Sequence, residues 1–374
     1  MKLQIFQMKH TLNIQPVSSW LKIDKPLIVS GPCSAESESQ MVNTAKQLAA
    51  LNKVHILRAG IWKPRTRPDQ YEGAGETGLK WLISAKKETG LPVTTEVANA
   101  AHTEACLKAG VDILWIGART TVNPFSVQEI ANVLKGVDIP VFVKNPVNPD
   151  LELWIGALER LNRAGITKLV AIHRGFSSFD KNGPFRNAPM WDIPIELKVR
   201  HPELEIICDP SHICGQRDLI PFIAQKAFDL DMAGLMIESH ISPDSALSDA
   251  KQQITPAALG KMLNELIART ASSADKIFKD QLSKLREQIN KIDDDVMLTL
   301  AARMKISEQI GNYKRDNNVT ILQVSRWEEI IQTRLAQGNA MGLSEDFVNN
   351  LLKLIHQESI SVQQKVMNEK TLKL

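Results

Sequence analysis

The last third of this chain contains almost no residues that break helices. None of its 18 prolines lies beyond Pro256, and only three of its 19 glycines lie beyond Gly260. A single homogeneous fold would spread these residues along all 374 positions, so their absence predicts a turn-rich module followed by one with few turns. The length allows two domains of ordinary size.

Other absences exclude several classes of protein. The four cysteines (Cys33, Cys106, Cys208 and Cys214) show no CxxC spacing, and Met1–Pro16 lacks a signal-peptide pattern, so we expect a cytoplasmic protein with free thiols. No apolar run approaches the roughly 18 residues of a membrane span. Net charge is +3, and residues 271–374 hold 15 basic against 14 acidic side chains, so no basic patch suggests nucleic acid as a partner.

The turn-rich module contains eight short runs rich in Val, Ile and Leu, and most of the stretches between them have helical spacing. The runs are 27–31, 54–60, 91–97, 113–118, 140–145, 168–175, 205–212 and 234–240. Alternating strands and helices indicate a parallel α/β fold, and eight units favour a closed (β/α)8 TIM barrel. The alternative is an open doubly wound sheet, but the Gly-x-Gly-x-x-Gly pattern typical of that fold is missing.

Each predicted strand ends in ionisable or metal-binding side chains, and in a barrel these ends meet on one face. Six of these residues are cations, which implies anionic ligands such as phosphates and carboxylates. They are Arg58, Lys63, Arg65, Arg119, Lys144 and Arg174.

A second group at the same ends has the donors of a divalent metal site: Cys33, His212, Glu238 and Asp249. Mixed sulfur, nitrogen and oxygen donors suit manganese, iron, cobalt or zinc better than magnesium or calcium, and we expect manganese first. Two alternatives stay open. Cys33 alone would also suit a small buried apolar site. His240 competes with Glu238, because residues two apart on a strand face the same side.

Five separated motifs resemble the type I 3-deoxy-D-arabino-heptulosonate 7-phosphate (DAHP) synthases in their shorter β-subtype form. They are GPCSAES (31–37), RAGIWKPRT (58–66), GAR (117–119), DPSH (209–212), and ESH with SDA (238–240 and 248–250). The resemblance spans roughly residues 20–265. It implies condensation of phosphoenolpyruvate with erythrose 4-phosphate, the first step of the shikimate pathway.

The resemblance also implies roles for individual residues. The four donors above match the metal ligands. Arg58, Lys63, Arg119, Lys144 and Arg174 are expected to bind phosphoenolpyruvate, with Lys63 and Asp209 catalytic and Asp209 beside the aldehyde. Arg65, Thr66 and Ser211 match the sugar-phosphate pocket. Position 145 is Asn where several relatives have Arg. The rival is a 3-deoxy-octulosonate 8-phosphate synthase, whose Lys-Ala-Asn-Arg motif differs from Lys63-Pro64-Arg65-Thr66 here.

The proline-free module is predicted to consist of long helices. We place a barrel domain at 1–265, a linker at 266–276 and a helical domain at 277–374, with a last barrel helix over 257–271 running into the linker. Apolar residues recur every three or four positions from Phe278 to Leu300. The pattern predicts a helix of about 38 residues, which needs a partner chain or another long helix to bury its stripe. A plain coiled-coil dimerisation tail is the alternative.

Polar residues on this stripe suggest a ligand site. Arg303 and Lys314 are eleven apart and share a face, whereas Arg286 lies about 25 Å from Arg303 along the helix. If all three hold one ligand, Arg286 must come from the other subunit. Ser359 and Gln363 form an i, i+4 pair.

Three segments, LREQINKID (285–293), LAARMKISEQIGNYK (300–314) and ESISVQQ (358–364), resemble the all-helical chorismate mutases. The resemblance implies a three-helix domain in an intertwined dimer that rearranges chorismate to prephenate without a cofactor. Arg286, Arg303, Lys314, Arg326, Ser359 and Gln363 match its chorismate-binding residues, with Arg303 and Lys314 catalytic. Gln323 and Trp327 stand where acids are common, so we expect altered recognition of the chorismate hydroxyl with activity retained.

Two enzymes that are not consecutive in one pathway suggest regulation rather than channelling. We expect prephenate or chorismate, bound by the helical domain, to inhibit the synthase allosterically. The alternatives are a non-catalytic sensor and a module that only dimerises the barrel.

Overall fold

The computed structural model describes residues 11–23, 26–63, 71–178, 183–270 and 272–368. The chain divides into two compact units, Met1–Ala271 and Ser272–Leu374. No helix in the described ranges has both the length and the apolarity to cross a membrane.

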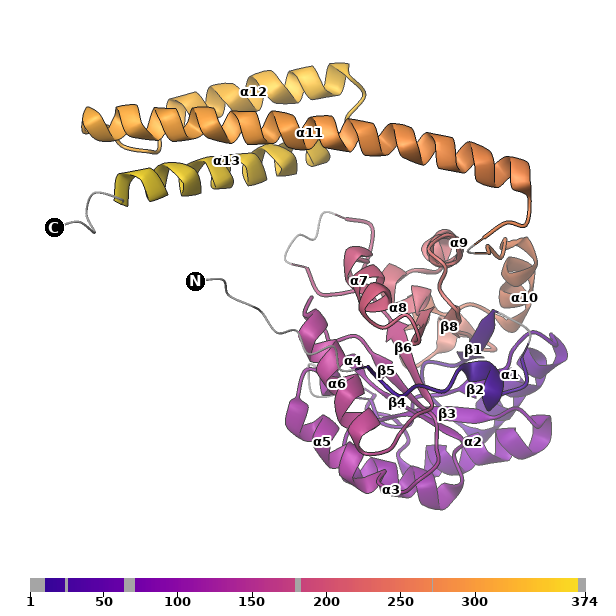
Figure 1. Ribbon diagram of the computed structural model, residues 1–374. Helices are drawn as coiled ribbons and strands as arrows, with labels where there is room; N and C mark the ends of the chain where they lie inside the picture. The colour runs from indigo at the N-terminus through magenta and orange to yellow at the C-terminus, as the bar shows by residue number, and fades with distance from the viewer. Residues whose placement is uncertain (1–10, 24–25, 64–70, 179–182, 271, 369–374) are drawn as a thin grey trace. The chain divides into compact units, whose positions relative to one another are not determined.

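The first unit is a closed barrel of eight parallel strands, in which each strand pairs with the next and β8 pairs with β1 (Figure 1). The strands are β1 (Leu27–Gly31), β2 (Ile56–Arg58), β3 (Val93–Val97), β4 (Ile113–Ile116), β5 (Val141–Lys144), β6 (Leu169–His173), β7 (Glu205–Cys208) and β8 (Gly234–Glu238). The predicted (β/α)8 barrel is confirmed and the open sheet is excluded.

Helices surround the barrel and supply the outer layer of the core (Figure 1). They are α1 (Glu38–Ala50), α2 (Glu76–Thr89), α3 (Ala100–Ala109), α4 (Ala118–Thr121), α5 (Pro124–Val133), α6 (Leu151–Arg163), α7 (Asp192–Arg200), α8 (Pro210–Cys214), α9 (Ile220–Asp229) and α10 (Pro256–Glu265). Short 3-10 turns lie at η1 (Val17–Ser19), η2 (Arg217–Leu219), η3 (Pro243–Ser245) and η4 (Ala250–Gln252). Polar side chains cap the N-termini of several helices. Asn123, for example, accepts hydrogen bonds from the backbone N–H groups of Phe125 and Ser126 at the start of α5.

Large apolar side chains fill the inside of the barrel, among them Val29, Ile56, Trp115, Phe142 and Met236. Since helices cover the other face, the strands are buried on both sides and read as continuous apolar runs. Most charged side chains of the strands therefore lie at or next to the carboxyl ends, where the loops begin.

Two glycines at this end of the barrel allow close contacts, one with a neighbouring backbone and one with a side chain. Gly31 has φ +154°, and a Cβ there would lie 2.0 Å from the carbonyl oxygen of Arg58. A Cβ at Gly117 would lie 2.0 Å from Oε1 of Glu96. Larger residues at either position would push apart the strand ends that carry the site.

The last barrel helix is shorter than expected, which corrects the predicted span of 257–271. Helix α10 ends at Glu265, and Leu266 is already extended. The side chain of Gln225 on α9 both accepts from the backbone N–H of Ile267 (2.9 Å) and donates to its carbonyl (3.1 Å). These two bonds satisfy the backbone groups of Ile267 outside a helix.

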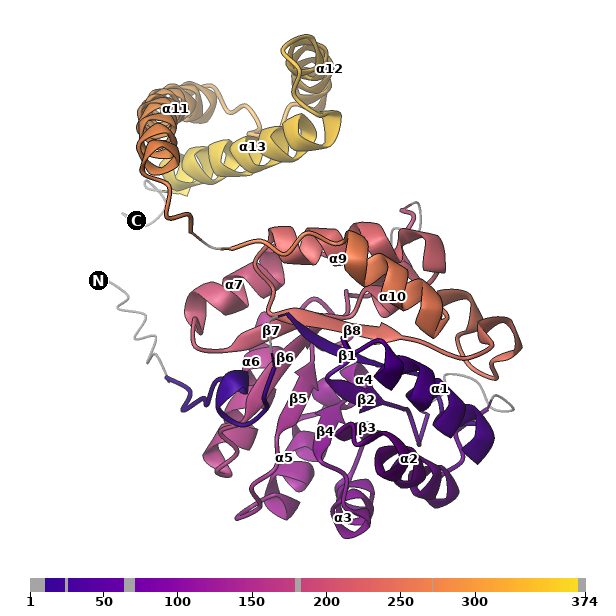
Figure 2. The same ribbon diagram turned by 90° about the vertical axis from the view of Figure 1, so that its right-hand side faces the viewer.

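The second unit consists of three helices, α11 (Lys276–Asp316), α12 (Val324–Ala340) and α13 (Glu345–Asn368). Helix α13 packs against both α11 and α12 (Figure 2). The side chain of Asp275 caps the N-terminus of α11 by accepting hydrogen bonds from the backbone N–H groups of Ile277 and Phe278. At 41 residues, α11 is close to the predicted length and spans about 60 Å.

The first half of α11 leaves its apolar stripe uncovered in the single chain. The stripe residues that are between 46% and 81% exposed are Ile277, Phe278, Leu285, Ile289, Ile292 and Val296. Exposed apolar area of this extent marks an interaction surface. The two shorter helices of the same chain do not bury it.

Candidate active sites

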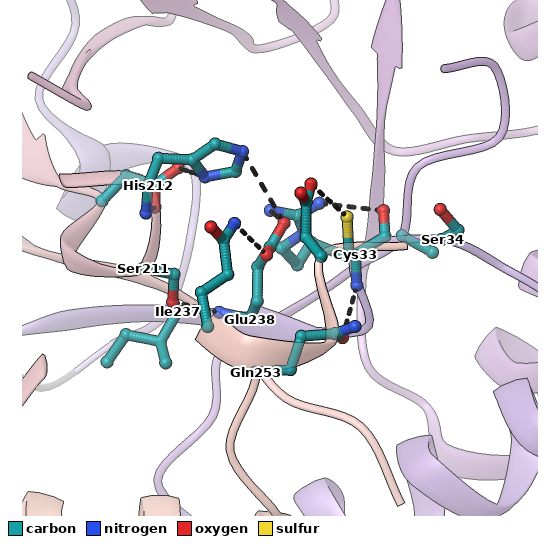
Figure 3. A network of polar contacts seen from close by, with 12 residues as sticks. Cys33, Ser34, Ser211, His212, Ile237, Glu238 and Gln253 are labelled. Carbon is teal, nitrogen blue, oxygen red and sulfur yellow. Dashed lines mark hydrogen bonds and ion pairs between the residues drawn. The ribbon is translucent and has the colours of Figure 1, made fainter. Parts of the chain in front are cut away.

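Three predicted metal donors converge at the carboxyl ends of the strands, and Figure 3 shows two of them, Cys33 and Glu238. Donor atoms of Cys33, Glu238 and Asp249 all lie within 4.8 Å of one another. Cys33 follows β1, Glu238 ends β8, and Asp249 lies in the loop after β8. Glu238 is fully buried, and Cys33 Sγ lies 3.3 Å from Asp249 Oδ2. A thiol and two carboxylates in one pocket match the donor chemistry of a transition metal.

His212 points toward this group from the start of α8 (Figure 3). Its Nδ1 lies 2.8 Å from Asp209 Oδ2, and its Nε2 lies 3.8 Å from Glu238 Oε1. A carboxylate on one ring nitrogen orients the other toward a metal. His240, the competing candidate, turns elsewhere: its Nδ1 accepts from Ser242 and its Nε2 lies 3.6 Å from Glu36.

The electrostatics of Cys33 fit a cation at this position. Burial, followed by the charge on Glu238, raises the pKa of the Cys33 thiol to about 12. A thiolate beside a carboxylate in a buried pocket needs a compensating positive charge, and a divalent ion supplies one. The four donors therefore fit a divalent metal.

A supporting shell, which the sequence patterns did not indicate, holds these donors. Gln252 donates to Glu238 Oε2 (2.7 Å), and Gln253 accepts from the backbone N–H of Cys33 (2.9 Å). Arg186 donates to Asp249 Oδ1 (3.0 Å) and to Gln252 Oε1 (2.8 Å). Gln252, Gln253 and Arg186 belong to no sequence motif that would predict this role. Only their positions in the structure show that they hold the donor residues.

Two of the predicted cations lie directly against the donor group. Arg58 is almost fully buried, with Nη1 3.2 Å from Glu238 Oε1 and Nη2 donating to the Cys33 carbonyl (3.3 Å). Its guanidinium carbon lies 4.8 Å from the centre of the Trp115 ring. Lys63 Nζ donates to the Cys33 carbonyl and lies 3.0 Å from Cys33 Sγ.

The other cations surround the same end of the barrel. Lys144 Nζ lies 2.8 Å from Asp209 Oδ2 in a buried ion pair. Arg174 donates to Asn187 Oδ1 (2.9 Å), and burial lowers its pKa to about 10, with the charges of Arg186 and Arg119 acting in the same direction. Arg119 itself is exposed at the start of α4. Like charges held together in this way form a site for anions.

Asn145 has a structural role at this site. Its Oδ1 accepts from the backbone N–H of Arg174 (2.7 Å), and its Nδ2 donates to the Pro146 and Gly175 carbonyls. The amide therefore fixes the backbone that carries Arg174. An arginine could not make the same set of bonds, because it has no acceptor.

Asp209 and Ser211 are both fully buried. Burial acts to raise the pKa of Asp209, but the charges of His212 and Lys144 outweigh it and hold the pKa well below its usual range. Ser211 Oγ accepts from the backbone N–H of Glu238 (3.0 Å) and so positions a metal donor. Arg65 and Thr66, also predicted for the sugar phosphate, lie outside the described residues.

A second cluster joins α11 to α13 in the helical unit. Arg303 donates to Ser359 Oγ (2.5 Å), and Gln363 packs against Gly311 with its buried Oε1 lacking a hydrogen-bond partner among the described residues. Lys314 donates to the Ile321 carbonyl (2.5 Å). Burial lowers the pKa values of both Arg303 and Lys314.

Two predicted chorismate contacts lie apart from this cluster in the single chain. Arg326 is exposed and pairs with Glu329 at 2.6 Å. Arg286 is exposed on α11, seventeen positions before Arg303. His356, which the sequence reading missed, stacks on Trp327 with ring centroids 3.9 Å apart. Its place three residues before Ser359 on α13 was the available signal.

Comparisons with known proteins match both units of the chain. Residues 22–272 match the model of the DAHP synthetase I family, and residues 285–364 match that of type II chorismate mutases. The chain belongs to the DAHP synthetase I family and carries a type II chorismate mutase domain after its barrel. It thus combines a transferase and an isomerase of aromatic biosynthesis. Members of the first family generally depend on a divalent metal.

Individual relatives cover the barrel. A phospho-2-dehydro-3-deoxyheptonate aldolase of Thermotoga maritima is 32% identical over 240 residues, which is 64% of this chain and 68% of the relative. A 2-dehydro-3-deoxyphosphooctonate aldolase of Legionella pneumophila is 28% identical over 278 residues, covering 69% and 94%. A crystal structure of the Thermotoga maritima DAHP synthase is 30% identical with a TM-score of 0.58, covering 64% of this chain and 67% of that one.

Proposed function

We propose that the barrel condenses phosphoenolpyruvate with erythrose 4-phosphate to give DAHP and phosphate. The observation that carries this proposal is the Cys33, Glu238 and Asp249 group, with His212 directed at it and cations around it. When bound there, a divalent ion would act as a Lewis acid toward the aldehyde oxygen. We expect manganese first, with iron, cobalt or zinc as alternatives.

The protein's own residues then bind and align two anions. In this proposal phosphoenolpyruvate is held by Arg58, Lys63, Arg119, Lys144 and Arg174. Arg58 also contacts the metal donor Glu238, and Lys63 also contacts Cys33. Carbon 3 of phosphoenolpyruvate attacks the aldehyde carbon, water adds to carbon 2, and the C–O bond to phosphate breaks. The residues contribute orientation and charge stabilisation, and Asp209 stays ionised beside the aldehyde because its pKa is low.

The sugar phosphate is the four-carbon one in this proposal. The barrel is similar to relatives of both kinds, so the barrel alone does not decide between the two sugar phosphates. The Lys63-Pro64-Arg65-Thr66 segment favours erythrose 4-phosphate, with Arg65, Thr66 and Ser211 on its phosphate side. The alternative is an octulosonate 8-phosphate synthase. Supplying erythrose 4-phosphate or arabinose 5-phosphate to the same preparation, and following loss of phosphoenolpyruvate, distinguishes the two.

We propose that the helical unit rearranges chorismate to prephenate as a homodimer. The exposed stripe on α11 supports the dimer, because a second copy would bury it. In such a dimer, Arg286 of one subunit would join Arg303, Lys314, Ser359 and Gln363 of the other. Arg326 would reach the ligand from α12. The reaction needs no cofactor, only selection of the reactive conformer and stabilisation of its developing charge.

We further propose that prephenate or chorismate, bound in the helical unit, inhibits the synthase. The support is the joining of two enzymes that are not consecutive in their pathway. The four cysteines, all free and buried, suit the reducing cytoplasm that this pathway enzyme would occupy. The alternatives remain a sensor without turnover and a module that only dimerises the barrel.

One experiment on the full chain tests these proposals together. Both reactions are assayed after chelation and after addition of single metals, with and without prephenate. Arg303→Ala serves as the key variant, because a pure dimerisation module would tolerate it. Chorismate bound without turnover would indicate a sensor, and synthase activity unchanged by prephenate and chorismate would refute the allosteric proposal.

A further inference from the structure

The only tryptophan of the helical unit stacks on a histidine beside the Arg303 and Ser359 pair. Trp327 of α12 and His356 of α13 have ring centroids 3.9 Å apart and ring planes 16° apart. Both side chains are half-buried. The stack joins two helices through the faces of the rings, so the edge of the imidazole, with its two nitrogens, stays available.

His356 lies on the side of α13 that carries Ser359 and Gln363. Residues 356, 359 and 363 are spaced by three and four, so they form one stripe along the helix. Ser359 and Gln363 in this stripe already face α11, where Arg303 donates to Ser359 and Gly311 packs on Gln363. His356 is therefore one helical turn from Ser359, which accepts the hydrogen bond from Arg303.

The imidazole is neutral near pH 7. Burial lowers the pKa of His356, and the charges of Arg303 and Lys314 lower it further. A neutral imidazole carries one N–H donor and one acceptor nitrogen. Neither ring nitrogen of His356 forms a hydrogen bond within the part of the chain that the structure describes, so both are free for a ligand.

The nearby side chains of α12 offer no carboxylate for the same task. Gln323 is uncharged, Trp327 is aromatic, Glu328 is exposed, and Glu329 pairs with the exposed Arg326. Arg303 and Lys314 provide charge for the ligand's carboxylates. A ligand that also carries a hydroxyl group needs a partner that both donates and accepts, and the imidazole edge provides one without adding charge.

We propose that His356, held flat by Trp327, is the specificity-determining residue that binds the uncharged hydroxyl of the ligand in the mutase pocket. This inference rests on the proposed mutase function and deepens it. Trp327 is a positioning residue, because it fixes the plane of the imidazole.

The test uses two inhibitors on the full-length protein. One is an oxabicyclic dicarboxylate that mimics the cyclic transition state and carries a hydroxyl, and the other is its deoxy form. His356→Phe keeps a ring on Trp327 but has no nitrogen. We expect this variant to bind the hydroxylated inhibitor about fivefold to tenfold more weakly than the wild type, as the loss of one hydrogen bond predicts. Its affinity for the deoxy inhibitor should be unchanged. Trp327→Phe keeps an aromatic ring against the imidazole and should therefore keep the preference for the hydroxyl.

Equal weakening of both inhibitors by His356→Phe would show a packing role and overturn the inference. If that variant does not fold, the wild-type chain labelled with nitrogen-15 histidine gives the answer. The His356 ring signals must then shift differently with the two inhibitors, and identical shifts would overturn it. If the wild type neither binds nor converts chorismate, the proposed mutase function itself fails, which is a separate and visible result.

Discussion

Lys63 Nζ lies 3.0 Å from Cys33 Sγ and 3.0 Å from the Cys33 carbonyl oxygen. Burial acts to lower the pKa of Lys63, but the charges of Cys33 and Glu238 outweigh it and raise the pKa. The lysine therefore remains charged beside the predicted metal donors. This contact joins the two groups that sequence reasoning had separated, the anion-binding cations and the metal donors.

Lys63→Met should reduce kcat of the synthase reaction by about a hundredfold or more, because the ammonium is lost from the reacting centre. Metal affinity should change much less, since the four donors remain. The measurements are steady-state loss of phosphoenolpyruvate and calorimetric metal titration. Lys46→Met is the control, because Lys46 pairs with Glu88 on the surface. Unchanged kcat at full metal loading would remove Lys63 from the mechanism.

Chelation should abolish the synthase activity and spare the mutase activity. The Arg303, Lys314, Ser359 and Gln363 cluster contains no thiol, imidazole or carboxylate, whereas the barrel groups Cys33, Glu238 and Asp249, with His212 directed at them. Adding manganese back should restore the wild type and fail to restore Glu238→Gln. Parallel assays of one chelated sample provide the comparison, and loss of both activities on chelation would contradict the assignment.

Arg186→Gln should weaken metal binding by roughly tenfold to a hundredfold, as is typical when a group that orients a ligand is removed. Arg186 holds Asp249 directly and Glu238 through Gln252. Competition with a fluorescent chelator measures the affinity. Arg200→Gln is the matched control, because Arg200 bonds only to surface carboxylates in the described residues. Equal affinities in the two variants would show that Arg186 does not support the metal donors.

His173→Leu should make the barrel less sensitive to acid. Burial, and then the charge of Arg174, lowers the pKa of His173 to about 3, whereas an unfolded histidine titrates near 6.5. Between these values the unfolded chain binds the extra proton, so the contribution present above pH 6.5 is lost as pH falls. The loss is up to about 1.4 kcal/mol per pH unit.

The barrel holds six of the seven tryptophans, so fluorescence during urea unfolding follows it. Measurements at pH 7 and pH 5, with chelator present, should show a smaller fall in the free energy of unfolding for His173→Leu than for the wild type. A parallel fall in both proteins would mean that His173 does not contribute to the acid response.

Mixing two inactive variants should restore mutase activity if subunits share the site. Arg286→Ala and Arg303→Ala each disable every site in their own dimers. After random exchange of subunits, half of the dimers are mixed and each has one intact site, so about a quarter of wild-type activity should return. Chorismate turnover before and after exchange measures it. Continued inactivity of a mixture shown to exchange would place both arginines in one chain's site.

The barrel was predictable because its signals are local. Runs buried on both faces are continuously apolar, and the chain order of a parallel barrel brings every strand end to one face. Cys33, Glu238 and Asp249 could thus be grouped without coordinates. The end of α10 could not be predicted, because Gln225, on another helix, decides it through two hydrogen bonds to Ile267.

By itself, the sequence determined the two modules, the eight strands, the long helix and the set of side chains at the strand ends. It did so through residue spacing and the distribution of prolines, which act on neighbouring positions. Only the tertiary structure decided which of these side chains meet. It turned His212 toward Glu238 and His240 toward Glu36, brought Arg186 to Asp249 and stacked Trp327 on His356. Such pairings depend on loop paths and rotamers across dozens of residues, and no local pattern encodes them.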